Sequence, residues 1–170
     1  MIKTLSRLLP LLAVPTLAGC GTVPLPAVGL PDVSLTTPVP LTASGLRIFQ
    51  NGTLFPAPVS RQLKNFQLTG TAALNKPVGE PTVFDVLLTR DLPVGCMAYA
   101  DYSACASGGQ SIGTVSFAAG AAQAPLLLRG DLLNTLAYEG TGHIGLQLRE
   151  GSLSAGATLK LSNLQAKAYF

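Results

Sequence analysis

Residues 66–74 read Phe-Gln-Leu-Thr-Gly-Thr-Ala-Ala-Leu, with an apolar side chain at every second position except the central Gly70. Successive side chains of a β-strand point to opposite faces, so this period of two predicts a long strand with one buried face. A glycine inside a strand often marks a β-bulge, and Gly70 predicts one here.

Similar alternation on both sides of this stretch predicts further strands. They fall at residues 46–48, 84–88, 115–119 and 144–148. The Asn51-Gly52 pair is a strong hairpin-turn signal, so we expect the first of these strands to continue at 53–55 beyond a tight turn.

The segment 126–136 predicts a longer strand that is apolar on both faces, interrupted only by Arg129, Asp131 and Asn134. No segment of the chain shows a convincing helical period, so the expected elements are strands throughout.

In the last predicted strand the apolar positions change phase. Leu159 and Leu161 are out of step with a later set: Leu164, Ala166, Ala168 and Phe170. A slip of one residue moves a strand's apolar side chains to the other face, and a β-bulge makes such a slip. We therefore predict a bulge at Ser162-Asn163 and a paired strand that runs to Phe170.

About seven or eight such strands, without a helix long enough for a crossover, predict an all-β fold. The expected architecture is a jelly-roll-like antiparallel β-sandwich formed by residues 46–170, with a closed barrel as the second choice. About 150 residues suffice for one domain with a substantial core.

The N-terminus has the character of a targeting segment. Lys3 and Arg7 precede an apolar run, residues 8–17, that Pro10 and Pro15 interrupt. A membrane-spanning helix needs about 20 apolar residues, so this run predicts an export signal and not a transmembrane helix.

The four residues that follow, Leu17-Ala18-Gly19-Cys20, resemble the lipobox of bacterial lipoproteins. The resemblance implies that residues 1–19 are a cleaved signal peptide, that the Cys20 thiol carries diacylglycerol, and that its new amino group is acylated too. The alternative is an ordinary secretory signal with Cys20 free or in a disulfide. Acyl chains would anchor the protein firmly, so the domain needs no membrane-binding surface of its own.

The residue after the cysteine is Gly21 and not aspartate. By the same resemblance, this implies an outer-membrane location in a cell with two membranes, and the outer face of the membrane in a cell with one. We therefore expect a cell-envelope protein whose domain lies outside the cytoplasm.

Residues 20–45 join the lipidated cysteine to the domain and are rich in proline. The prolines are Pro24, Pro26, Pro31, Pro38 and Pro40. Proline favours extended polyproline II structure, so a tether is expected. Its alternating apolar residues leave an alternative in which part of the segment is an edge strand of the domain.

Charge gives little indication of a partner. Without Lys3 and Arg7 the chain has nine basic and eight acidic residues, so its net charge is +1. Such a near-neutral balance predicts neither nucleic-acid binding nor a polybasic lipid-binding surface.

With Cys20 assigned to lipid, Cys96 and Cys105 remain, and in an exported protein they predict a disulfide. A metal or redox pair would need closer spacing or companion ligands. The loop that this disulfide closes contains Tyr99, Asp101 and Tyr102, residue types that suit a recognition surface. The alternative is a surface hairpin stapled only for stability.

Catalytic and metal sites are not predicted. The single histidine, His143, has Glu139 as its nearest carboxylate in sequence, but no nucleophile motif accompanies them. The carboxylates are scattered singly, so we expect no metal and no other cofactor. A calcium ion held by Asp85, Asp91 or Asp101 remains an alternative.

These observations predict a lipid-anchored envelope module that is structural or binds another envelope component through loops or a sheet edge. The alternative is a carbohydrate- or small-ligand-binding jelly roll. The chain has no tryptophan, and its aromatic residues are only four tyrosines and six phenylalanines, which disfavours a sugar-stacking face.

Overall fold

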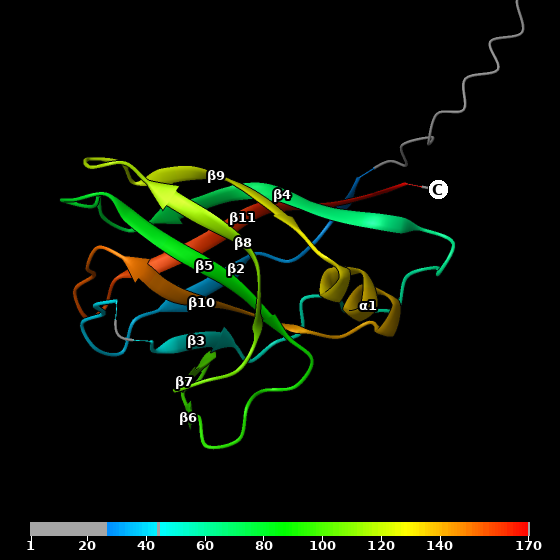
Figure 1. Cartoon of the computed structure of the whole chain (residues 1–170), viewed down its shortest axis with the longest axis horizontal. Helices are drawn as coiled ribbons and strands as arrows, with labels where there is room; N and C mark the ends of the chain where they lie inside the picture. Colours follow the sequence, from blue (N-terminus) through cyan, green and yellow to red (C-terminus); the bar gives the residue numbers. More distant parts are fainter. Residues whose placement is uncertain (1–26, 44, 170) are drawn as a thin grey trace, which may run out of the picture.

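The computed structural model describes residues 27–43 and 45–169. Two antiparallel sheets pack face to face, and the prediction of an all-β sandwich is confirmed (Figure 1). There are eleven strands and one helix in this part of the chain, more strands than expected because several are short. No helix among the described residues is long and apolar enough to cross a membrane.

The first sheet is built around the two longest strands. Its order is β1 (Val28–Gly29), β11 (Thr158–Tyr169), β4 (Lys64–Leu74) and β9 (Gln123–Arg129), with β2 (Val33–Thr36) also paired to β11. The alternation predicted for 66–74 is confirmed, since Phe66, Leu68, Ala72 and Leu74 are all buried.

The second sheet has six strands. Its order is β6 (Met97–Ala98), β7 (Tyr102–Cys105), β3 (Arg47–Gln50), β10 (His143–Glu150), β5 (Thr82–Thr89) and β8 (Gln110–Phe117). The main core lies between the two sheets, and inward-facing residues of both contribute to it. The strands predicted at 46–48, 84–88, 115–119 and 144–148 correspond to β3, β5, β8 and β10, although β8 ends at Phe117.

The predicted bulge is present where β11 passes β4. Ser162 pairs with Thr71 and Gln165 with Thr69, so two residues of β11 lie opposite Gly70 alone. A Cβ atom at Gly70 would lie 2.8 Å from the carbonyl oxygen of Ser162. The absence of a side chain at Gly70 therefore makes room for the bulge. The bulge shifts the register of β11, so the apolar side chains of both halves of the strand face the core.

The N-terminal segment joins the sandwich earlier than expected. Val28 pairs with Ala166 in β1, and residues 33–36 pair along β11 in β2. Val33 and Leu35 are buried in the main core. The edge-strand alternative is thus confirmed, and among the described residues strands of the sandwich are present from Val28 on, ahead of the residue 46 at which the domain was expected to begin. The predicted signal peptide, Cys20 and Phe170 lie outside the described residues.

The strand predicted at 126–136 is wrong beyond its first half. β9 ends at Arg129, and helix α1 (Asp131–Glu139) follows Gly130. Leu133, Leu136 and Ala137 are buried, which is the spacing of one helical face. The helix ends at Gly140, whose φ of 66° and ψ of 42° give the left-handed conformation that glycine adopts readily.

The hairpin predicted at Asn51-Gly52 is also wrong. Residues 51–63 contain no strand. Leu54 and Phe55 are both buried although they are adjacent, which an alternating strand does not allow. The backbone N–H of Leu54 donates to the Gly142 carbonyl oxygen at 2.7 Å, so this segment packs beside the chain that follows α1.

A second, smaller core lies on the outer face of the second sheet. Phe49, Leu87 and Cys105 form it, with Leu92 and Cys96 packed against them. Phe49 pairs across β3 and β10 with Gly145, where a Cβ atom would lie 2.4 Å from the Phe49 ring. The outer-face core therefore exists because glycine leaves space for the aromatic ring.

Candidate functional site

The tyrosine hairpin, defined as residues 96–105, extends the edge of the second sheet. β6 and β7 pair antiparallel within it, and β7 pairs with β3. The predicted disulfide is confirmed: Cys96 and Cys105 are bonded, with their Cα atoms 4.4 Å apart. Since Cys105 belongs to the outer-face core, the bond fixes the hairpin to a buried residue.

The tip of the tyrosine hairpin is held by Asn51. The Asn51 Nδ2 donates to the Tyr99 carbonyl oxygen at 2.8 Å, and its backbone N–H donates to the Asp101 carbonyl oxygen at 3.0 Å. The Ser103 hydroxyl donates to the Asn51 Oδ1 at 2.7 Å. This role could not be predicted from the sequence, because an Asn-Gly pair is typical of a hairpin turn.

The three predicted recognition residues lie together at this tip. The rings of Tyr99 and Tyr102 stack with their centroids 4.7 Å apart and their planes at 18°. Asp101 is exposed between them in sequence, and it forms no ion pair with any described residue. The segment 91–110 contains two aspartates and neither lysine nor arginine, so the hairpin surface is mildly acidic.

Exposed apolar side chains concentrate at the tyrosine hairpin. Val94 is fully exposed, Met97 is 62% exposed and Tyr99 is 38% exposed. These are half of the large apolar side chains that are exposed among the described residues; the others are Val28, Val39 and Leu127. Met and Tyr are enriched in protein interfaces, so this surface suits a protein partner.

The stacked pair affects the acidity of Tyr102. Burial raises the pKa of its hydroxyl above the ordinary 10.0, and Tyr99 raises this pKa further. We expect the Tyr102 ring carbon Cζ to titrate above pH 10.0 in an NMR experiment, and closer to the ordinary value in the Tyr99→Ala variant. Because the pKa of Tyr102 is higher in the folded state than in the unfolded state, the unfolded state loses this proton first as pH rises. The contribution of the Tyr102 hydroxyl to stability is therefore present below pH 10 and is lost as pH rises through the folded pKa. A Tyr102 midpoint at or below 10.0 would contradict the burial described here.

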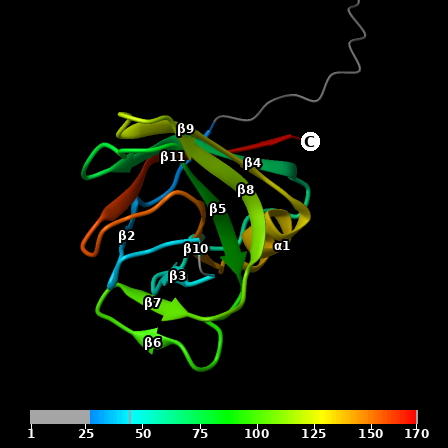
Figure 2. The ribbon, with the colours of Figure 1, turned by 60° about the vertical axis from the view of Figure 1, so that its left-hand side comes forward.

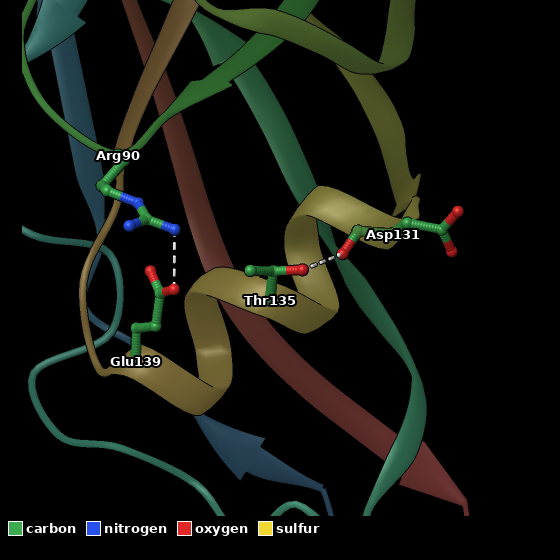
Figure 3. Close-up of polar contacts among 4 residues, drawn as sticks. All are labelled: Arg90, Asp131, Thr135 and Glu139. Atoms are coloured by element: carbon green, nitrogen blue, oxygen red, sulfur yellow. Dashed lines mark hydrogen bonds and ion pairs between the residues drawn. The ribbon is translucent and has the colours of Figure 1, made fainter.

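No hydrogen bond joins His143 and Glu139 in the structure. The His143 Nδ1–H donates to the Gln50 carbonyl oxygen at 3.1 Å. Glu139 lies at the end of α1, where its Oε1 accepts from the Arg90 Nη2 at 2.7 Å (Figure 3). These partners are structural, and they differ from those of a base and its orienting carboxylate.

The three aspartates considered for calcium lie on different segments. Asp85 is in β5 and faces Arg149 at 3.7 Å, Asp91 follows β5, and Asp101 is at the hairpin tip. Among residues 27–43 and 45–169, no three His, Cys, Asp or Glu side chains come close enough to hold a metal ion.

A groove of about 650 Å³ runs beside α1. Asn134 connects its walls, since its Oδ1 accepts from the Phe66 backbone N–H at 2.8 Å. Within the helix, the Thr135 hydroxyl donates to the Asp131 carbonyl oxygen, while the Asp131 carboxylate points away from it (Figure 3). Arg61 and Lys64 line the opposite wall. The sequence did not indicate this groove, because α1 was not predicted.

No family model matches the chain, and no curated protein or solved structure matches it significantly. The arrangement itself offers a rigid, exposed, mildly acidic aromatic surface on the tyrosine hairpin and a polar groove beside α1. The first suits recognition of a partner, and neither brings together the groups that covalent catalysis needs.

Proposed function

We propose that this chain is a lipid-anchored protein of the bacterial cell envelope whose β-sandwich presents the tyrosine hairpin to another envelope protein. The observation that carries the proposal is the hairpin itself. It combines a disulfide, the Asn51 hydrogen bonds and a stacked tyrosine pair with exposed Met97, and the exposed Val94 lies two residues before the hairpin begins. A rigid surface of this kind loses little conformational entropy on binding, so its apolar area contributes to affinity.

The location in the envelope is supported by the lipobox resemblance at residues 17–20 and by the disulfide, which suits an exported protein. An outer-membrane position follows from Gly21 if the cell has two membranes. The tyrosine hairpin lies on the far side of the domain from β1, where the described chain begins, and from the C-terminal end of β11 (Figures 1 and 2). An anchor at Cys20 would therefore leave the hairpin facing away from the membrane.

A protein partner fits this surface better than a polysaccharide. Val94 and Met97 have no side-chain group that donates a hydrogen bond to a sugar hydroxyl. The two tyrosine rings also stack on each other, so each covers one face that a sugar ring would otherwise use.

We expect the Val94→Ala/Met97→Ala/Tyr99→Ala variant of the acylated protein to lose its partner in proximity cross-linking from native membranes. Recovery of one specific envelope protein should fall at least about tenfold, because central aromatic and apolar residues carry most of an interface's binding energy. The matched control is Val39→Ala/Leu127→Ala, which removes exposed apolar side chains elsewhere and should leave recovery unchanged.

Equal losses in both variants would contradict a role for the tyrosine hairpin. Co-purification of polysaccharide without any cross-linked protein would replace this proposal with the carbohydrate alternative. Mass spectrometry of the N-terminal peptide tests the anchor separately, since the peptide should begin at Cys20 and carry its acyl groups.

A further inference from the structure

Basic residues are distributed unevenly over the domain. Three of them are used in ion pairs with carboxylates: Arg90, Arg149 and Lys160. Four others gather at one end of the first sheet, here called the basic end: Arg61, Lys64, Arg129 and Lys167. All four are exposed, and none forms an ion pair with any described residue.

Strand register places these cations together. Gln67 of β4 pairs with Arg129 of β9 on one side and with Lys167 of β11 on the other. Directly paired residues share a face, so both cations project from the outer face of the sheet, about 10 Å apart across two strand spacings. Lys64 begins β4 at the same end and lines the groove beside α1 together with Arg61.

Few acidic side chains offset this charge. Asp131 and Glu139 line the same groove as Arg61 and Lys64. Glu139 is already paired with Arg90 at 2.7 Å, so that pair is neutral. The basic end therefore has an excess of positive charge, although the chain after residue 19 has a net charge of only +1.

The basic end is also the end at which the described chain begins. Val28 pairs with Ala166, the neighbour of Lys167 in β11. Cys20 and Ala27 are seven residue steps apart, and a fully extended chain of that length spans at most about 25 Å. A lipid on Cys20 would thus keep the basic end close to the bilayer.

Apolar surface lies at the same end of the sheet, on the side that faces the core. Val28 is 63% exposed and lines a hollow of about 80 Å³ together with Leu63 and Ala168. This volume is about half that of the cavity that accepts benzene in an engineered protein, so it is too small for an acyl chain. An exposed apolar group at the same end of a domain as several lysines and arginines instead suits a surface that lies in the head-group region.

We propose that the basic end binds the anionic phosphate head groups of the membrane surface and holds the sandwich upright with the tyrosine hairpin outward. The chemistry is that of arginine and lysine with phosphate oxygens. The orientation rests on the proposed lipid anchor, whereas head-group binding by these residues does not. It adds a membrane-binding surface to a domain whose anchor alone does not require one.

The test uses the chain from residue 20 with Cys20→Ala, which has no acyl group and keeps every residue of the two core clusters. Sedimentation with vesicles of equal parts phosphatidylglycerol and phosphatidylethanolamine should show binding that weakens as salt is added. Vesicles of phosphatidylcholine should bind far less. The Lys64→Ala/Arg129→Ala/Lys167→Ala variant should bind the anionic vesicles at least about tenfold more weakly.

The matched control is Lys76→Ala/Arg149→Ala/Lys160→Ala, which removes the same charge from the opposite end of the long strands. It also breaks two ion pairs at the surface, Arg149 with the half-buried Asp85 and Lys160 with the exposed Asp32, and pairs at the surface contribute little to stability. It should keep vesicle binding within about twofold of the parent chain. Circular dichroism confirms that both variants are folded.

Equal losses in the two triple variants, or equal binding to phosphatidylcholine, would overturn the proposal. So would binding to polygalacturonate, an acidic polysaccharide, without binding to the anionic vesicles. Because this assay needs no acyl group, its result is independent of the mass of the Cys20 peptide. The proposal of head-group binding and the proposal of a lipid anchor can therefore be contradicted separately.

Discussion

Replacing Phe49 with alanine is expected to lower the free energy of unfolding by about 3 to 5 kcal/mol, the usual cost of truncating a fully buried phenylalanine. Phe49 has no exposed surface and forms the outer-face core with Leu87 and Cys105. The loss should appear as a lower urea midpoint in an equilibrium unfolding curve. The Val39→Ala variant truncates an exposed side chain and should change stability by less than about 0.5 kcal/mol.

Substitution of Gly145 tests the packing of the Phe49 ring more specifically. A Cβ atom at Gly145 would overlap the Phe49 ring at 2.4 Å, so Gly145→Ala alone should destabilise the protein by about 1 to 3 kcal/mol. In the Phe49→Ala background the ring is absent, and the added methyl group should cost much less. A double-mutant cycle measures the difference as a coupling energy between the two sites. Purely additive losses would contradict the packing of the ring on the glycine.

Removing the disulfide is expected to lower the free energy of unfolding by about 2 to 3 kcal/mol, the loop-entropy value for roughly ten residues. The loop from Cys96 to Cys105 has a sequence separation of 9. The Cys96→Ala/Cys105→Ala variant should therefore unfold at a lower urea concentration than the oxidised protein. The tyrosine hairpin should also lose amide protection in hydrogen exchange before the rest of the sheet does.

A reducing agent supplies the control for the disulfide. It should lower the stability of the parent chain towards that of the double alanine variant and should leave the variant unchanged. A parent chain that is insensitive to reductant, in an experiment that confirms free thiols, would show that the outer-face core holds the hairpin without the bond.

Much of the sandwich could be predicted because the core-facing side chains of its long strands follow a period of two, although Leu87 of β5 is also buried on the outer face. β4, β5 and β10 alternate with a period of two, and the change of phase in β11 predicted the bulge at Ser162-Asn163. Alternation fails as a guide where both faces are covered or where no regular element forms. Residues 126–136 are apolar on both faces, so the pattern could not show that Gly130 ends a strand and that a helix begins.

The candidate site was predictable only in its local part. Cys96 and Cys105 enclose Tyr99, Asp101 and Tyr102, so nearby residues and cysteine spacing indicated the hairpin. Asn51, which holds the tip of the hairpin by hydrogen bonds, is about fifty residues away in sequence, and no local pattern connects it with the hairpin. The basic end could not be predicted for the same reason. A net charge is a sum over the whole chain, and it contains no information about the strand register that brings distant basic residues together.

The pairing of β11 has a consequence for the order of events during folding. β11 is the most C-terminal strand described, yet it lies inside the first sheet, between β4 on one side and β1 and β2 on the other. β1 and β2 therefore have no partner strand in this sheet, and β4 has only β9, until residues 158–169 are available. Non-local pairing of this kind also folds slowly. The topology thus delays completion of the first sheet until its last described strand is available, which would suit the export proposed above.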